Sequence, residues 1–360
     1  MRAIPLERIP VLLWALAFAV IAVAPFFIGR IGVFLIMEAL MFGTAAVALN
    51  LLLGFGKMVS FGHAAWWGLG AYGTGVTLQQ LTGLGVLGAI GLSVAITIVV
   101  AAVVGYFCVK RGSIYFAMLT LAFSQLVAII ILRMRGLTGG EQGLTGGVPR
   151  PPIGPFDIST ILNFYYFTLV VCALAIGAMA LFIASPFGLS LRALAANPDR
   201  AQASGINVKF HQWATFVVSA AFAAIGGGLH AIFQSAAFPE TVHWTTSATL
   251  VFMALIGGLG HLAGPLVGAF VFIYLERFAG GVLEARELVL GGLILFIVVA
   301  MRGGVAGVAT SAGRWAALRL GLTGANSQLD EELKGGSLRT DASDIDVPIE
   351  PRGRTSHGDT

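Results

Sequence analysis

The stretch LNFYYFTLVVCALAIGAMALFIASPFGLSLRALAANPDRAQASGINV, residues 162–208, contains the two features that decide the fold. Its first part, 162–184, is one continuous apolar run, and about 20 such residues are enough to cross a bilayer as a helix. Its second part, 185–208, carries charged residues, two prolines and two glycines. The stretch therefore predicts a membrane-spanning helix followed by a compact polar element outside the bilayer.

Apolar runs of this kind recur along the whole chain. The chain is 57% hydrophobic and 11% charged, whereas a soluble domain is about one quarter charged. The runs are continuous and do not alternate, which excludes a transmembrane barrel. We count ten of them, at 9–29, 31–53, 58–79, 86–109, 113–132, 162–184, 212–234, 246–260, 264–279 and 285–301.

We therefore expect an all-α, polytopic transmembrane helix bundle of about 8–10 spans. The third run is interrupted by glycine, and the eighth and ninth are short and joined by GLGHLAG. These three are the runs that could form broken or re-entrant segments. Residues 1–310 form the predicted transmembrane domain. Residues 311–360 have few large apolar side chains to offset the entropy of ordering, which predicts a disordered cytoplasmic tail.

Basic residues indicate the orientation, because cytoplasmic loops of membrane proteins are enriched in lysine and arginine. With ten spans and a cytoplasmic N-terminus, 15 of the 21 basic residues lie inside and 6 lie outside. Arg133 and Arg135 go against this rule. The asymmetry predicts a multi-pass protein of the cytoplasmic (inner) membrane with both termini inside, and with the polar segment 185–210 in the cytoplasm.

One long loop, residues 135–160, is expected outside. It contains GLTGG twice, at 136–140 and 143–147, and its exit is rich in proline. Glycine permits unusual backbone angles and proline stiffens the chain. Two interpretations remain open: a flexible connector, or a loop that folds back to line a substrate path or meet an external partner.

The polar segment begins with helix-start signals. Ser185 is a good N-cap and Pro186 suits the first helical position. The following FGLSLRALAA places apolar residues near one face and Arg192 elsewhere, as in a short amphipathic helix.

A second, shorter helix is predicted directly afterwards. Asn197 is a strong N-cap, Pro198 fits the first helical position, and Asp199 favours the positive end of a helix. Gly205 suits the position after the last turn. A helix of about seven residues is not stable alone, so it must dock on the protein itself, on lipid, or on a cytoplasmic partner.

Few polar groups lie within the apolar runs. Glu38 is the one clear acid inside a run. It is either a gate or pathway residue, or a carboxylate that is paired near the interface or held protonated. Ser124 and Gln125, with Thr120, lie on one face of the fifth run, which suits a translocation path or hydrogen bonding between helices. Asn50 and His230 are single polar residues with the same default interpretation.

Motifs for other chemistry are missing. Near Lys57 the chain reads LLLGFGKMV, which lacks the first glycine and the hydroxyl of a phosphate-binding loop. The histidines have no metal-ligand spacing, and no hydrolase or metalloprotease motif occurs. We expect no catalytic residue, no bound metal or cofactor, and no enzymatic activity of this chain.

At this point the polar segment resembles the cytoplasmic loop of permease subunits of ABC importers, in the form found in the branched-chain amino-acid family. The general importer pattern has an E-A-A triplet followed by three residues and a glycine. In this chain the triplet positions are occupied by Asp199, Arg200 and Ala201, and the glycine position by Gly205. The first two residues of the triplet differ from the general pattern.

Further stretches, in order along residues 40–280, are similar to the same family. They are LNLLLGFGKMVSFGHAAWWGLGAY (49–72), RGSIYFAMLTLAFSQL (111–126), TGGEQGLTGG (138–147) and MALIGGLGHLAGPLVGA (253–269). The resemblance implies a permease for branched-chain or related hydrophobic amino acids, a small-molecule substrate, and no nucleic-acid partner.

The resemblance also implies partners: a second permease subunit, two cytoplasmic ATPases that carry the ATP, and an external substrate-binding protein. It assigns contact with an ATPase to Asn197, Pro198, Asp199, Arg200, Ala201 and Gly205. Two alternatives stay open. One is a permease of the same class for urea or short-chain amides, and the other is an ion-coupled secondary transporter.

Overall fold

The computed structural model describes residues 9–81, 83–110, 113–144, 146–154, 156–282, 291–292 and 304. Within these residues the secondary structure is helical, with two isolated β-bridges. The predicted all-α class is confirmed. The predicted tenth span, 285–301, lies outside the described residues except for 291–292, and the predicted tail, 311–360, lies outside them entirely.

The helices follow one another in a regular series. The long ones are α1 (Ile9–Val23), α2 (Arg30–Asn50), α3 (His63–Gln80), α4 (Gly85–Cys108), α5 (Ser113–Arg133), α7 (Ile161–Ala184), α10 (Val208–Gln234), α11 (Trp244–Gly257) and α12 (Gly264–Val282). The short ones are η2 (Ala24–Phe26), η3 (Leu51–Phe55, a turn of π-helix), α6 (Arg135–Thr138), η4 (Gly140–Gln142), α8 (Pro186–Ala196), α9 (Pro198–Ala203) and η5 (Pro239–Val242).

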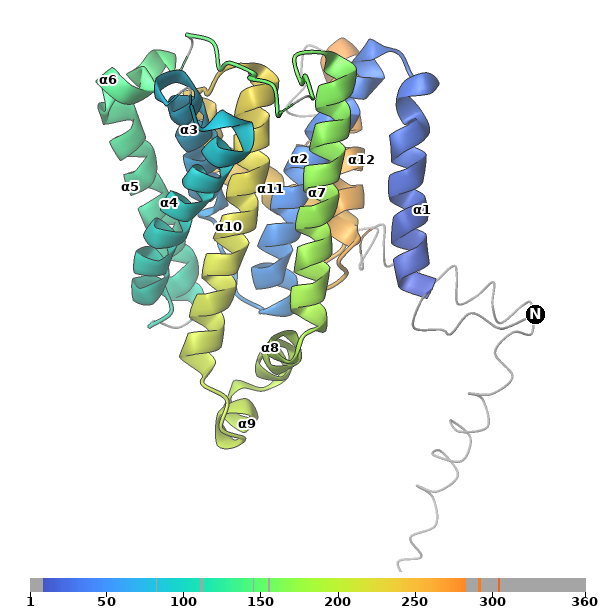
Figure 1. The fold of residues 1–360 in the computed structure, drawn as a ribbon. Coiled ribbons are helices and arrows are strands. Elements are labelled where there is room, and N and C mark those ends of the chain that lie inside the picture. Colours follow the sequence, from blue (N-terminus) through green and yellow to red (C-terminus); the bar gives the residue numbers. More distant parts are fainter. Residues whose placement is uncertain are drawn as a thin grey trace, which may run out of the picture. The chain divides into compact units, whose positions relative to one another are not determined.

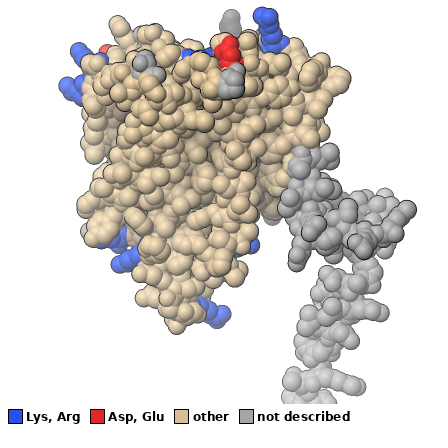
Figure 2. All heavy atoms as spheres, viewed as in Figure 1, with Lys and Arg blue, Asp and Glu red and all other residues tan. Residues whose placement is uncertain are grey.

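The long helices stand side by side in one bundle with two distinct ends (Figure 1). One end carries α8 and α9, and the opposite end carries α6 and the loop that leads to α7. Five described helical segments are long and apolar enough to cross a membrane. They are Arg30–Phe55, Gly85–Cys108, Ile114–Arg133, Ile161–Ala184 and Val208–Gln234. Figure 2 shows charged side chains at the two ends of the visible face and a broad uncharged band between them.

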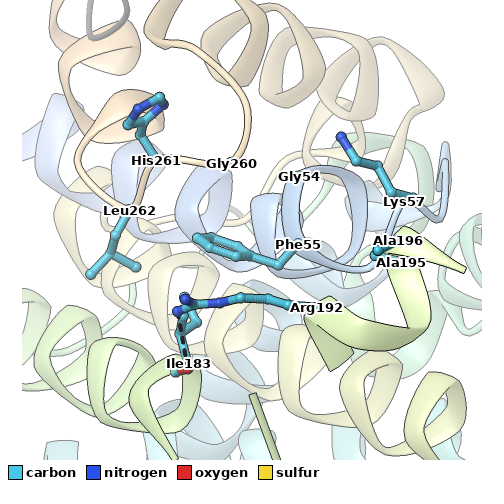
Figure 3. Close-up of a pocket in the computed structure, with 10 residues that line it drawn as sticks. All are labelled: Gly54, Phe55, Lys57, Ile183, Arg192, Ala195, Ala196, Gly260, His261 and Leu262. Carbon is cyan, nitrogen blue, oxygen red and sulfur yellow. Dashed lines mark hydrogen bonds between the residues drawn. The ribbon is translucent and has the colours of Figure 1, made fainter. Parts of the chain in front are cut away.

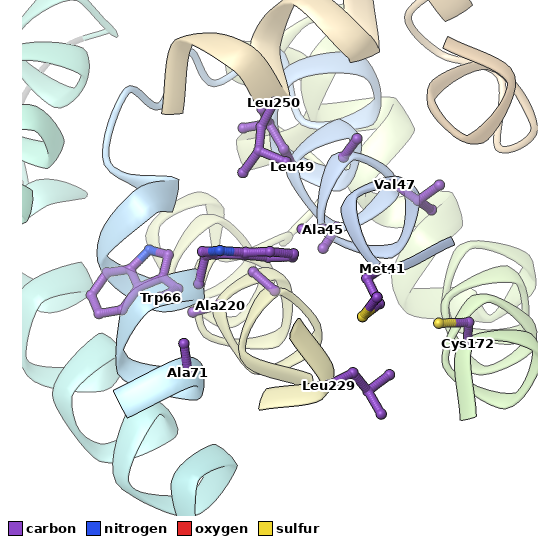
Figure 4. Close-up of a cluster of buried hydrophobic side chains, with 14 of the residues drawn as sticks. Met41, Ala45, Val47, Leu49, Trp66, Ala71, Cys172, Ala220, Leu229 and Leu250 are labelled. Atoms are coloured by element: carbon purple, nitrogen blue, oxygen red, sulfur yellow. The ribbon is translucent and has the colours of Figure 1, made fainter. Parts of the chain in front are cut away.

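The core of the bundle is built around α2 and α10. In each of these two helical segments, 67% of the most apolar 18-residue stretch is buried. The corresponding share is 33% in α4 and in α5. Figure 4 shows side chains of α2 surrounded by side chains from α3, α7, α10 and α11. A Cβ on Gly227 of α10 would lie 1.9 Å from the Trp67 carbonyl oxygen of α3, so only glycine permits this contact. Small residues thus set the distance between helices, as expected for packing in a membrane.

The third apolar run differs from its prediction. It is helical only from His63, and residues 56–62 form an irregular segment between η3 and α3. Lys57 takes a left-handed conformation (φ 53°). A Cβ on Gly62 would lie 2.4 Å from the Thr120 carbonyl oxygen, so the segment is pressed against α5. This tertiary contact explains why the helix starts later than the hydropathy suggests.

The eighth and ninth runs form a tight antiparallel pair, α11 and α12. With 14 residues, α11 is about 21 Å long, less than the ~30 Å hydrocarbon core. A Cβ on Gly268 would lie 1.9 Å from the Met253 carbonyl oxygen, so the two backbones touch. The structure therefore selects the short-segment interpretation for the eighth run.

The loop between α6 and α7 is fastened to the end of α10. Leu144 and Ala237 form a β-bridge, and the Val148 N–H donates to the Ser235 carbonyl (2.8 Å). Arg150 donates from Nε and Nη2 to carbonyls of the last turn of α10, at 3.0 and 2.8 Å. Its positive charge suits the negative end of that helix, and partial burial lowers the pKa of Arg150. Of the two interpretations, the structure favours a loop that folds back.

Candidate functional site

The polar segment forms the two helices predicted from its caps. The Ser185 Oγ accepts a hydrogen bond from the Gly188 N–H (3.3 Å) at the start of α8. The Asn197 Oδ1 accepts from the Arg200 N–H (3.0 Å) at the start of α9. A cap not foreseen from the sequence, Asn207, starts α10 in the same manner. Local side-chain chemistry therefore sets all three helix starts.

The end of α9 is closed by Gly205. This residue has φ +83°, and a Cβ on it would meet no atom within 4 Å. The Ile206 N–H donates to the Ala201 carbonyl (3.1 Å), and the Gly205 N–H donates to the Gln202 carbonyl (3.0 Å). These bonds form a helix C-cap that requires a left-handed residue, which confirms the predicted position of Gly205.

The structure separates the six predicted coupling residues into two groups. Five are exposed: Asn197, Pro198, Asp199, Arg200 and Gly205. Ala201 is 4% exposed, and α9 packs against α8 and α10. The side chain of Ala201 thus anchors the helix, and the other five form its free surface.

Directly before α9, α8 is docked on the bundle. Leu191 and Leu194 are buried. Arg192 donates from Nη2 to the Ile183 carbonyl (3.2 Å), and its guanidinium lies 5.7 Å from the centre of the Phe55 ring. Figure 3 shows Arg192 reaching along Phe55 at the edge of an open pocket of about 570 Å³. The protein's own surface therefore holds α8 and leaves α9 exposed.

The same pocket joins three parts of the bundle. Its walls include Gly54 of η3, Arg192 of α8, and Gly260 and His261 of the turn between α11 and α12. Asn50, at the end of α2, donates from Nδ2 to the His261 carbonyl (3.0 Å) and accepts from the Gly260 N–H at Oδ1 (3.2 Å). These bonds confirm the prediction that Asn50 links helices. The pocket thus lies where α8, the end of α2 and the turn between α11 and α12 meet.

A second buried polar link lies next to the irregular segment 56–62. His63 Nδ1 is 3.2 Å from Ser60 Oγ, and its Nε2 is 2.8 Å from Ser219 Oγ of α10. The Ser219 hydroxyl donates to the Ala48 carbonyl of α2. Sequence reasoning missed this network because its members are up to 171 residues apart, although a histidine just after a break in an apolar run was a visible signal.

The three predicted translocation-path residues lie on two helices, α2 and α5. Glu38 lies half-buried on α2, close enough to Glu276 and Arg277 of α12 to interact with their charges. Ser124 and Gln125 lie on α5, which packs against α3 and α4. The Ser124 Oγ and Gln125 Nε2 atoms are buried without a hydrogen-bond partner in the described part of the chain. Buried polar atoms are nearly always hydrogen-bonded in folded proteins, so these two atoms are candidates for contact with a group outside the described residues.

A further pair of orphaned polar atoms lies in the core. His230 Nδ1 of α10 and Trp67 Nε1 of α3 are buried without hydrogen-bond partners among the described residues. The two rings are 5.2 Å apart, and each packs against Phe42 of α2, at 5.4 and 4.5 Å. The prediction of a hydrogen bond between helices is therefore wrong for the Nδ1 atom of His230. An aromatic cluster at the junction of three central helices is a candidate path element that sequence reasoning did not identify.

Comparison of the sequence with known proteins identifies one family. Residues 31–298 match the family model described as "Branched-chain amino acid transport system / permease component". The chain is 25% identical over 311 residues to the high-affinity branched-chain amino acid transport system permease protein LivM of Salmonella typhimurium, covering 80% of this chain and 73% of that protein.

Two shorter similarities involve other relatives. The probable branched-chain amino acid transport permease protein LivH of Methanocaldococcus jannaschii is 34% identical over 107 residues, covering 29% of this chain and 32% of that protein. The guanosine ABC transporter permease protein NupQ of Bacillus subtilis is 28% identical over 131 residues, covering 36% of this chain and 39% of that protein. No solved structure matches the chain.

The family model spans most of the chain, including α2 to α12 and therefore both α8 and α9. Together with the membrane-length helices, it establishes a multi-pass membrane protein that acts as a transport subunit. The chain belongs to the family of permease components of branched-chain amino acid transport systems.

Proposed function

We propose that this chain is the membrane-spanning permease subunit of an ABC importer that moves branched-chain or related hydrophobic amino acids across the cytoplasmic membrane. The observation that carries the proposal is α9, a capped helix of six residues that stands exposed at one end of the bundle. Ala201 anchors α9 on the protein's own surface, and the exposed face of the helix is available to a partner. The chain carries no nucleotide-binding motif, so separate subunits supply ATP hydrolysis, and the chain itself binds no cofactor.

The partners are two cytoplasmic ATPases, a second permease subunit and an external binding protein. One ATPase binds the exposed face of α9. This face consists of Asn197, Pro198, Asp199 and Arg200, together with Gly205 after the end of the helix. The loop 135–160, fastened to α10 at the opposite end, offers a fixed surface to the binding protein. The orphaned polar atoms on α5 suit contact with substrate or with the second permease.

The orientation follows from the partner of α9. An ATPase that uses cellular ATP is cytoplasmic, so the α8–α9 end faces inside, and the Ile9 end of α1 points the same way (Figure 1). The basic residues within the described ranges are divided equally between the two ends of the bundle, so they do not indicate the orientation. Five basic residues lie towards the α9 end (Lys57, Lys110, Arg192, Arg200 and Lys209) and five towards the other (Arg30, Arg133, Arg135, Arg150 and Arg277). The predicted N-in, C-in topology thus rests on α9 and on basic residues outside the described ranges.

Transport is a shift between two bundle conformations driven by the ATPases. Closure of the ATPases pushes α9, and α8 transmits the push to the point where Asn50 holds the turn between α11 and α12. Binding energy that differs between the inward-open and outward-open states drives the shift, since a ligand moves an equilibrium only by its differential affinity.

Purification of the tagged chain from its own membrane tests this proposal. We expect two ATPase copies and a second permease to co-purify. In vesicles containing the complex and its binding protein, we expect ATP-dependent uptake of labelled leucine that exceeds uptake of labelled urea and guanosine. Guanosine is included because the NupQ protein is among the relatives. Uptake driven by an ion gradient without ATP would instead identify a secondary transporter.

A further inference from the structure

A groove opens between α4 and α10 at the α8–α9 end of the bundle. It measures about 420 Å³. The last turn of α4 provides Tyr106, and the turn after it provides Val109 and Lys110. The start of α10 provides Lys209, Phe210 and Trp213. We refer to it as the Lys110–Lys209 groove. It is separate from the α8 pocket, and none of the functions discussed above uses it.

The walls of the groove are fixed by contacts between the two helices. The Trp213 Nε1–H donates to the Ala102 carbonyl of α4 (2.8 Å). Phe210 packs beside Trp213, with ring centres 6.0 Å apart. Lys110 Nζ lies 3.9 Å above the centre of the Tyr106 ring. The aromatic walls are therefore formed before any ligand binds, and one of the two ammonium groups is held in place.

The charge of the groove is positive and uncompensated. Lys110 and Lys209 are both exposed, and no carboxylate in the described part of the chain pairs with either of them. Tyr106 and Phe210 are more than half exposed, at 55% and 52%. Two cations beside exposed aromatic rings, one of them directly above the Tyr106 ring, suit a ligand that is anionic at one end and apolar at the other.

An apolar stripe on α4 leads directly to the groove. Ile96, Val99, Val103 and Phe107 are exposed at 45%, 65%, 56% and 53%, and their spacing of three and four places them on one helix face. Lys110 follows in the turn directly after α4, with its ammonium above the ring of Tyr106. In a membrane this stripe faces acyl chains, so a lipid lying against it has its headgroup at the level of Lys110. This continuity favours a lipid over a soluble anion.

We propose that the Lys110–Lys209 groove binds an anionic phospholipid. The phosphate lies between the two ammonium groups, and the acyl chains follow the stripe from Phe107 to Ile96. A lysine near an anionic lipid surface contributes about fivefold to binding. The two lysines together therefore predict about a 30-fold preference for an anionic over a zwitterionic lipid at this site.

Native mass spectrometry of the detergent-purified chain tests the proposal. The probes are phosphatidylglycerol and phosphatidylcholine with identical acyl chains, added in equal amounts. We expect one phosphatidylglycerol to bind preferentially to the wild-type chain, Lys209→Gln to reduce the preference about fivefold, and the Lys110→Gln/Lys209→Gln variant to abolish it. Lys57→Gln removes the same charge at the same end of the bundle but outside the groove, and is expected to keep the preference.

Two further measurements keep the test decisive if a glutamine variant proves unstable. The Lys110→Arg/Lys209→Arg variant keeps both charges and should bind as the wild type does. Raising the salt concentration should weaken the wild-type preference, whereas inorganic phosphate at millimolar concentration should not displace the lipid, because it lacks acyl chains.

Four results would overturn the proposal. The first is an absence of lipid preference in the wild type, and the second is an equal loss in Lys57→Gln and Lys209→Gln. The third is normal lipid binding by the lysine variants combined with loss of co-purifying ATPase, which would assign the groove to a protein partner. Displacement by inorganic phosphate alone would identify a soluble-anion site instead.

Discussion

Replacement of Gly205 tests whether the backbone at the end of α9 is needed for coupling. At φ +83° an L-amino acid is strained by about 1–2 kcal/mol. No neighbouring atom lies within 4 Å of a Cβ placed there, so Gly205→Ala adds strain and no steric clash. This strain is equivalent to a factor of about 5 to 30 in the equilibrium between capped and uncapped α9.

The structural effect of the Gly205→Ala substitution should be confined to α9. Loss of the cap breaks the bond from the Ile206 N–H to the Ala201 carbonyl, and six residues cannot keep a helix without it. The bundle itself is unchanged, so thermal stability in detergent should match the wild type. The expected result is a 5- to 30-fold fall in substrate moved per ATP hydrolysed, measured in vesicles that contain the whole complex.

Two variants separate strain from other causes. Gly205→Asn should retain more coupling than Gly205→Ala, because asparagine tolerates the left-handed region. Gly177→Ala on α7 also meets no neighbour within 4 Å and has no left-handed φ, so it should behave as the wild type. If Gly205→Ala couples normally, or if the asparagine variant is as impaired as the alanine variant, the argument from backbone strain is wrong.

Three other predictions concern the ends and the core of the bundle. Arg150→Met removes hydrogen bonds from a charged donor to the end of α10 and should destabilise the protein by about 2 kcal/mol, measured as a lower Tm. Arg150→Lys should have an intermediate Tm. An unchanged Tm in Arg150→Met would show that the loop stays in place without these hydrogen bonds. Asp199→Cys and Glu141→Cys lie exposed at opposite ends, while Cys108 and Cys172 are buried. An impermeant maleimide added to intact cells should label only the second variant, and the reverse pattern would invert the topology. Gly227→Val would clash with the α3 backbone and should prevent accumulation of folded protein, whereas Gly91→Val, with open space around its Cβ, should not; equal yields would contradict the packing argument.

The caps of α8 and α9 show what local chemistry can predict. Asn197 bonds to an N–H three residues away, and Gly205 closes the helix through bonds that span five residues or fewer. Such interactions join residues that are close together in the sequence, so the sequence alone is enough to predict where they occur. Apolar runs long enough for a bilayer identify the membrane class for the same reason.

The candidate path shows where local reasoning stops. Glu38 and Gln125 were chosen because they are polar within apolar runs, yet they lie on two helices, α2 and α5, that pack mainly against different neighbours. The cluster of His230, Trp67 and Phe42 was not anticipated, since its members come from three helices and are ordinary core residues in isolation. Which polar atoms remain orphaned depends on which helices pack together.

By itself, the sequence of this protein determined the all-helical membrane class, the starts and end of the two polar helices, and the family pattern. Only the tertiary structure decided that Ala201 faces inward while its neighbours are exposed, that His63 bonds to Ser219, and that Arg150 caps α10. The physical reason is the sequence separation over which each interaction acts. Hydropathy and capping act within one helix, whereas these contacts join residues 82 to 156 positions apart and exist only once glycine-mediated packing has brought the helices together.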